Sequence, residues 1–226
     1  MKYFREACCT SVEAVLAAER TGGHRIELCE RLEVGGVTPS EALLREVLAA
    51  TSLPVNVLVR PRGGDFVYTE EEVQTMLESI RLCRSLGAHG VVIGALTPAG
   101  HVNMPLMRRL VAAAKDSHPG PLDSHPGLDP GSPSLSVTFH RAFDESTDPF
   151  AALEDVIALG CDRLLTSGHA ADAFAGRALI GELVRRAAGR IVVMAGCGVR
   201  PGNIAQIAAD SGAPEFHSSC ISEDWV

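Results

Sequence analysis

The stretch Ala158-Leu-Gly-Cys-Asp-Arg-Leu-Leu165 joins the end of a helical pattern, a glycine and the start of an apolar strand. The same plan returns in Ala18-Glu-Arg-Thr-Gly-Gly-His-Arg-Ile-Glu27 and in Ser85-Leu-Gly-Ala-His-Gly-Val-Val92. A glycine at the end of a helix takes the left-handed cap conformation, and a strand can then begin within a few residues. The chain therefore repeats one helix-to-strand unit.

Eight short apolar segments alternate with seven helical patterns along the whole chain. The predicted strands are Tyr3–Cys9, Arg25–Cys29, Pro54–Arg60, Gly90–Gly94, Leu135–His140, Arg163–Thr166, Arg190–Met194 and Glu215–His217. The predicted helices are Ser11–Arg20, Ser40–Ala50, Glu70–Leu86, Met104–Lys115, Pro149–Leu159, Ala175–Ala188 and Pro201–Ser211. Strict alternation implies parallel strands and right-handed crossovers, and it favours a closed barrel over an open sheet.

We therefore predict an α/β fold, a (β/α)8 TIM-type barrel, in one domain that spans residues 1–226. The chain stops nine residues after the last predicted strand. We expect either a barrel that lacks its last outer helix or a truncated form.

One segment interrupts the alternation. Residues 116–133 are rich in Pro, Gly, Ser and Asp, and they repeat Ser-His-Pro-Gly at 117–120 and 124–127. Such a composition cannot bury a core and predicts a disordered surface loop. Its two histidines could bind a metal, but a tolerated insertion is the stronger interpretation.

Composition excludes several classes of partner. The formal net charge of -8 and the pI near 5.5 argue against a nucleic acid or an anionic membrane surface as partner. No signal peptide or membrane-spanning apolar run is visible, so we expect an intracellular protein. The seven cysteines include no C-x-x-C pair, which predicts reduced thiols rather than disulfides or a structural zinc site.

Two strands that we expect to be neighbours end in the same pattern, Glu6-Ala7-Cys8 and Glu27-Leu28-Cys29. Residues two apart in a strand face the same way, and neighbouring strands lie about 4.8 Å apart. If both pairs face the barrel interior, two thiols and two carboxylates converge at its mouth. Paired thiols suit a soft ion such as Cu(I). The alternative is that Cys8 and Cys29 are small core residues, the usual role of a free cysteine.

The third strand runs into Arg60-Pro-Arg62-Gly63-Gly64-Asp65, which is typical of an anion clamp. Planar guanidinium groups bind an oxyanion in pairs of hydrogen bonds, and the glycines let backbone N–H groups approach it. The alternative is that Arg60 pairs with Glu27 or Glu6 in a buried structural network. Both interpretations remain open from the sequence.

Polar groups also follow later strands. His140 lies at a strand tip, where it could act as acid, base or ligand. Thr166 ends the next strand, and Gly196 and Gly198 form a turn that, together with His217, occupies the place where such barrels often hold a phosphate. An ordinary tight turn is the alternative. The third glycine of a dinucleotide fingerprint is missing.

These residues support a second hypothesis, an enzyme that acts on a small anionic or phosphorylated metabolite at the barrel mouth. In it Glu27 or His140 is the base, and Arg60 and Arg62 hold the anion. A third, blander interpretation is a scaffold whose polar rim is a structural charge network.

Several motifs in one order resemble the copper homeostasis protein CutC family. They are Arg60–Phe66, Gly94–Thr97, Val137–Asp144, Leu165–Gly168 and Gly189–Met194. The resemblance implies a (β/α)8-type barrel in a homo-oligomer, a dimer or tetramer, located in the cytoplasm and in animals also in the nucleus. It implies a role in copper homeostasis, with Cu(I) bound by two cysteines whose positions match Cys8 and Cys29.

This chain departs from the family pattern at two places. The turn after the seventh strand, usually all glycine, reads Ala195-Gly-Cys197-Gly, and Cys197 could narrow an oxyanion pocket or add a third thiol. After the eighth strand, His217-Ser-Ser-Cys-Ile221 replaces His-Cys-Ser-Ala-Arg, and the longer tail of the family is absent.

Overall fold

The structure is a computed structural model that describes residues 3–115 and 134–219. The loop expected at 116–133 and the end of the chain from residue 220 lie outside the described residues. No helix in the described part combines the length and apolar character needed to cross a membrane.

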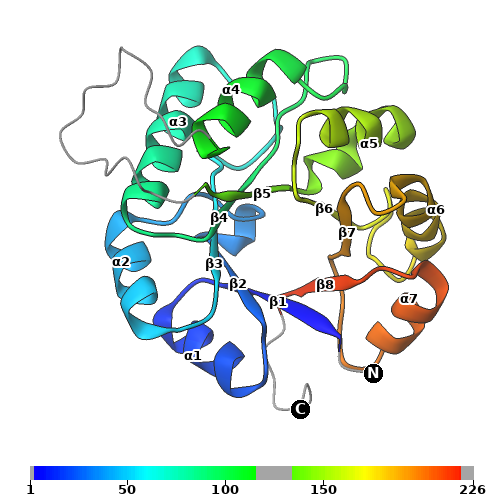
Figure 1. Cartoon of the computed structure of the whole chain (residues 1–226), viewed down its shortest axis with the longest axis horizontal. Helices are drawn as coiled ribbons and strands as arrows, with labels where there is room; N and C mark the ends of the chain where they lie inside the picture. Colours follow the sequence, from blue (N-terminus) through cyan, green and yellow to red (C-terminus); the bar gives the residue numbers. More distant parts are fainter. Residues whose placement is uncertain (1–2, 116–133, 220–226) are drawn as a thin grey trace.

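Eight parallel strands close into one barrel in the order β1 to β8, and seven α-helices surround it in the described residues (Figure 1). The strands are β1 (Phe4–Cys9), β2 (Arg25–Leu28), β3 (Val55–Leu58), β4 (Gly90–Ile93), β5 (Ser136–Phe139), β6 (Arg163–Thr166), β7 (Val192–Ala195) and β8 (Glu215–Ser218). The helices are α1 (Val12–Arg20), α2 (Glu41–Ala50), α3 (Glu70–Ser85), α4 (Met104–Lys115), α5 (Pro149–Ala158), α6 (Arg177–Ala187) and α7 (Ile204–Ser211). The predicted fold class is confirmed.

Two 3-10 turns lie between these elements, η1 (Leu32–Val34) after β2 and η2 (Arg141–Glu145) after β5. The helix boundaries follow from local chemistry. Thr69 and Glu72 form the capping box of α3, which satisfies two backbone N–H groups at its start. Gly87 and Gly160 end the preceding helical segments with φ of 82° and 74°, as the repeated unit predicted.

The apolar core lies between the barrel wall and the helices. Residues that face outward from the barrel, such as Ile26, Val57 and Val91, are at most 1% exposed because the helix layer covers them. Strands such as β4 and β7 read as short runs rich in β-branched and apolar residues, which is why they could be found from the sequence, whereas β2 alternates charged and apolar residues.

The barrel interior, in contrast, carries a network of charges. The Arg25 guanidinium donates to Glu6 Oε2 and to Glu215 Oε2, the latter at 2.5 Å, and it reaches Met194 Sδ of β7 at 3.5 Å. Arg163 also donates to Glu215, at 3.1 Å. Arg25 is only 3% exposed, so these charges stabilise one another away from water. A buried partner for Glu6 was expected, but it is Arg25 rather than Arg60.

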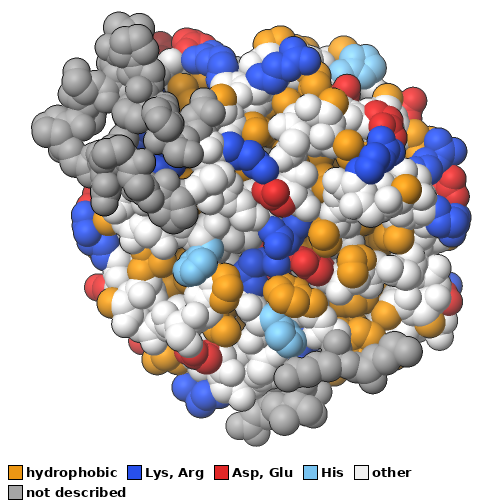
Figure 2. All heavy atoms as spheres, in the orientation of Figure 1, with side chains coloured by type: hydrophobic (Ala, Val, Ile, Leu, Met, Phe, Trp, Pro, Cys, Tyr) orange, Lys and Arg blue, Asp and Glu red, His pale blue; other side chains and the backbone are white. Residues whose placement is uncertain are grey.

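Figure 2 shows the molecular surface in the orientation of Figure 1. Basic and acidic side chains are interspersed near its centre, separated by apolar and uncharged groups. The view therefore shows no broad patch of a single charge sign on this face.

Replacing Arg25 with methionine should lower the free energy of unfolding by about 3–5 kcal/mol, because it removes the cation that Glu6 and Glu215 share and leaves each with one remaining partner, His217 and Arg163. Urea unfolding followed by circular dichroism measures the loss. Arg45→Met is the matched control, since Arg45 makes an exposed pair with Glu41; its effect should stay within about 0.5 kcal/mol. Equal effects of the two substitutions would contradict the claim that the buried ion pairs of Arg25 stabilise the fold.

Candidate functional site

A pocket of ≈ 700 Å³ opens at the carboxyl ends of the strands. Its lining combines thiols, carboxylates, histidines and arginines from different strand ends: Cys8, Glu27, Cys29, Arg60, His140, Arg141, Asp144, His169, Cys197, Arg200 and His217. This is the end at which barrels of this type carry their functional groups.

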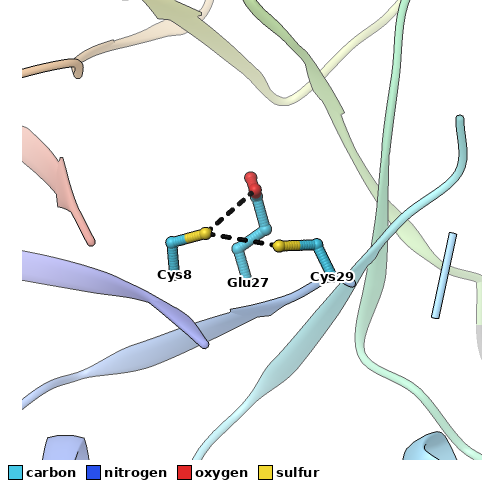
Figure 3. Close-up of side chains that lie close together, drawn as sticks. All are labelled: Cys8, Glu27 and Cys29. Carbon is cyan, nitrogen blue, oxygen red and sulfur yellow. Dashed lines mark hydrogen bonds between the residues drawn. The ribbon is translucent and has the colours of Figure 1, made fainter. Parts of the chain in front are cut away.

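The two predicted thiols meet at the floor of this pocket. Cys8 Sγ from β1 lies 3.5 Å from Cys29 Sγ, directly after β2, and both residues are buried (Figure 3). Glu27 reaches the same place, with Oε1 3.9 Å from Cys8 Sγ. The predicted convergence of these groups is confirmed, and the three form a cluster of possible metal ligands.

The strand register staggers the two thiols. Cys8 is level with Glu27, so Cys29 lies two residues further along its strand. From the strand spacing and the rise per residue, the two Cα atoms are roughly 8 Å apart. An unstrained disulfide needs Cα atoms closer than about 7 Å. The pair is therefore better placed to share a ligand than to form a disulfide.

The loop after β2 covers Cys29 through a glycine. Gly36 has a φ of 85°, and a Cβ at this position would lie 2.8 Å from the Leu58 side chain and 3.6 Å from Cys29 Sγ. Only glycine permits both the positive φ and this close approach. The loop can therefore close over the thiol.

Deeper in the barrel than the thiols, Glu27 lies near an ion pair between Glu6 and His217. His217 Nδ1 lies 2.9 Å from Glu6 Oε1 and 3.9 Å from Glu27 Oε2. Burial would raise the pKa of Glu6, but its hydrogen bond to His217 and the charge of Arg25 lower it to about 2. The pKa of His217 rises to about 9, because the charges of Glu27 and Glu6 outweigh its burial. Glu6 and His217 therefore form a charged pair at neutral pH.

Glu27 itself is less fully compensated. Burial raises its pKa to about 7, with repulsion from Glu6 adding to the effect and the charges of His217 and Arg25 opposing it. Its Oε2 atom has no hydrogen-bond partner among the described residues. A group that titrates near neutrality beside an open pocket can accept or release a proton.

The environment of Cys8 favours its protonated form. Its contact with Cys29, its burial and the nearby charge of Glu27 all raise the pKa of the thiol. Without a metal the thiol therefore keeps its proton at neutral pH. A bound metal ion must displace that proton.

Arg60 is buried at the side of the pocket without a counter-charge. It donates to the carbonyl oxygens of Val34, Gly36 and Gly64, at 3.1, 3.1 and 2.6 Å, and its guanidinium lies 4.7 Å from the centre of the Phe66 ring. No carboxylate in the described residues forms an ion pair with it. The alternative pairing of Arg60 with Glu27 or Glu6 is therefore wrong.

His140 is held as a neutral hydrogen-bond donor. Its Nδ1 accepts the backbone N–H of Ala142 at 3.1 Å, so the ring proton is on Nε2, which has no partner among the described residues. Burial and the charge of Arg60 lower its pKa to about 3. Because Nδ1 is already occupied and Nε2 carries the proton, His140 has no free lone pair to accept a proton from a ligand. Of the two predicted bases, Glu27 is therefore the better placed.

Some predicted anion-binding residues do not line the pocket. Arg62 donates to Glu72 at 2.6 Å and to Asp65 at 3.0 Å, which fixes the outside of the β3–α3 loop. Gly63 packs against the η1 turn, where an added Cβ would lie 2.8 Å from the Val34 side chain. Of the predicted clamp, only Arg60 and Gly64 belong to the lining.

Thr166 and Gly196 also lie behind the pocket surface, whereas Gly198 lines it. Thr166 is fully buried and donates to Asp144 Oδ1. At Gly196 a Cβ would lie 2.3 Å from Leu165. Both residues therefore support the pocket wall, and neither reaches a ligand directly in this arrangement.

Asp144 organises the rim and was missed by sequence reasoning. It accepts the backbone N–H groups of Ser167 and His169, and Arg141 Nε at 2.8 Å. It thereby ties the loop after β5 to the loop after β6. Asp144 lies in the η2 turn, five residues after β5 ends, and nothing in the sequence indicated its partners in the next loop.

Cys197 lines the pocket, but apart from the thiol pair. It has a positive φ of 73°, and its Sγ donates to the carbonyl of Ala171 at 3.3 Å. The possible metal-ligand groups in the described residues do not include it.

Comparisons with known proteins agree with one another. The model of the CutC family matches residues 3–222. A CutC family protein of Parabacteroides distasonis is 51% identical over 98% of this chain and 84% of its own length. The human copper homeostasis protein cutC homolog is 44% identical over 97% of this chain and 74% of its own length. A CutC protein of Streptococcus agalactiae with a solved structure has a TM-score of 0.84 at 29% identity and covers 97% of this chain and 100% of its own. This chain belongs to the CutC family.

Proposed function

We propose that this protein serves copper homeostasis by binding Cu(I) between the thiolates of Cys8 and Cys29. The observation that supports this most is the 3.5 Å separation of the two sulfur atoms at the floor of an open pocket. A relative that is 44% identical carries copper homeostasis in its name.

The donor set fits Cu(I) better than it fits other common ions. Thiolates are soft ligands that suit Cu(I), and structural zinc sites take four protein ligands in a tetrahedron, one more than this cluster provides. Here two thiols and one carboxylate form the cluster. Magnesium and calcium prefer sites made of several oxygen ligands, whereas this cluster has one carboxylate beside two thiols.

The surroundings also suit a transient ligand. The pocket gives the ion a route to and from solvent, while Leu58 and Val92 form an apolar cluster around the two thiols. Reduced thiols persist in the cytosol, where we place the binding reaction. Glu27 adds a nearby negative charge that offsets part of the cost of holding a cation there.

Substituting both Cys8 and Cys29 with serine should weaken Cu(I) binding by roughly 100-fold or more, because hard hydroxyls replace both soft ligands. Competition titration of the reduced protein against a chromogenic Cu(I) chelator measures the affinity. Cys9→Ala is the matched control: Cys9 lies on the same strand with the opposite side-chain direction and bonds the Ala7 carbonyl instead. Unchanged affinity in the double variant would rule out these ligands.

Cu(I) affinity should also fall as the pH falls. The metal-free state holds a proton on Cys8, whose pKa is raised, and the bound state does not, so acid favours the free protein. Each proton released corresponds to about a ten-fold change in affinity per pH unit. The same competition titration at pH 6, 7 and 8, corrected for protonation of the chelator, gives the slope. A flat profile would show that binding releases no thiol proton.

A further inference from the structure

The pocket is much larger than the proposed metal site needs. Its volume of ≈ 700 Å³ lies within the range of about 300–1,000 Å³ that is usual for small-molecule sites. The thiol pair occupies only the floor on the β1–β2 side. The part of the wall that follows β3 and β5 carries polar groups that a two-thiolate ion does not touch.

Arg60 gives this wall a buried positive charge. The residue is 6% exposed, and its guanidinium has carbonyl oxygens but no carboxylate as partners in the described part of the chain. Its Nε–H has no hydrogen-bond acceptor there, and its charge acts on the buried Tyr68 hydroxyl and the exposed Asp65 carboxylate. A buried, unpaired cation is costly, so an anion that enters the pocket would be stabilised beside it.

His140 adds an uncharged donor to the same wall. It is 5% exposed, lines the pocket and has an unpartnered Nε2–H. The rings of His140 and Phe66 lie 5.0 Å apart, and Arg60 stacks on the same Phe66 ring. Phe66 therefore holds the two polar side chains close to each other at one side of the pocket.

The rim offers a second positive group. Arg200 is exposed, and its guanidinium donates to the carbonyl of Val199 at 2.8 Å. Gly198, with a φ of 68°, lies beside it in the lining. Arg141, in contrast, is already paired with Asp144 at 2.8 Å.

We propose that the pocket binds a small organic molecule through a carboxylate or phosphate group, which accepts hydrogen bonds from Arg60 and His140 and faces Arg200. This second ligand goes beyond copper binding and does not depend on it. An apolar ligand would leave the donors of Arg60 and His140 buried without acceptors. The oxyanion is the ligand group that satisfies both residues.

The test uses the full chain and two probes that separate the sources of the oxyanion. Glycerol 3-phosphate represents a phosphate monoester and malonate a carboxylate; glycerol is the uncharged control. Isothermal titration calorimetry at constant ionic strength measures each affinity. We expect saturable binding of at least one anionic probe, with one site per chain, and none of glycerol.

Two substitutions assign the site. In His140→Asn the side-chain oxygen can still accept the Ala142 N–H, while the Nε2–H donor is lost. Arg200→Gln removes the rim charge. Each should weaken binding of the anionic probe about ten-fold or more. Arg45→Gln, an exposed arginine outside the lining, is the matched control and should leave the affinity unchanged.

The outcomes are separable from those for copper. Binding of the probe that persists in the Cys8→Ser/Cys29→Ser variant supports an independent oxyanion site. The proposal is overturned if neither anionic probe binds saturably, or if His140→Asn and Arg200→Gln bind the probe as tightly as the unsubstituted protein while their circular dichroism spectra show the native fold.

Discussion

The contact on which this barrel depends is the one that Arg25 makes with two carboxylates inside it. Small barrels usually fill their interior with layers of branched apolar side chains. Here Arg25 links Glu6 of β1 to Glu215 of β8, at the seam where the first and last strands pair. Arg25 and His217 both place a positive charge next to the Glu6 carboxylate. Glu27, at the pocket floor, has no hydrogen bond from either group and is the less neutralised carboxylate of the two. The charges inside the barrel thus help to set the protonation of Glu27 at the pocket floor.

Most of the fold could be predicted from the sequence, for physical reasons that can be named. Strands such as β4 and β7 read as short apolar, β-branched runs, and glycines such as Gly87 and Gly160 mark where helices end. The strict alternation of strands and helices then favoured a closed barrel of parallel strands over an open sheet. The η1 turn after β2 was not predicted, because its shape depends on carbonyl contacts with Arg60, a residue far along the chain.

The site was predictable only in part. The period of two along a strand correctly brought Cys8 and Cys29 together, since neighbours in a barrel share an interior. The same period also places Arg25 on the face of Glu27 and Cys29, so the partner of Glu6 could have been found by extending the pattern one step toward the start of β2. Which arginine of Arg60 and Arg62 faces the pocket could not be found, because both follow the strand in a loop whose path is fixed by Glu72 and Gly64.

The stagger of the two thiols has a consequence for how the site responds to its surroundings. Cysteines whose backbones are too far apart to bridge are poor sensors of oxidants, because the oxidised form requires the strands to shift against each other. A barrel wall resists such a shift, since moving one strand breaks its hydrogen bonds to both neighbours. The thiol pair is therefore expected to stay reduced when the redox potential of its surroundings changes, and so to stay available to the metal ion proposed above.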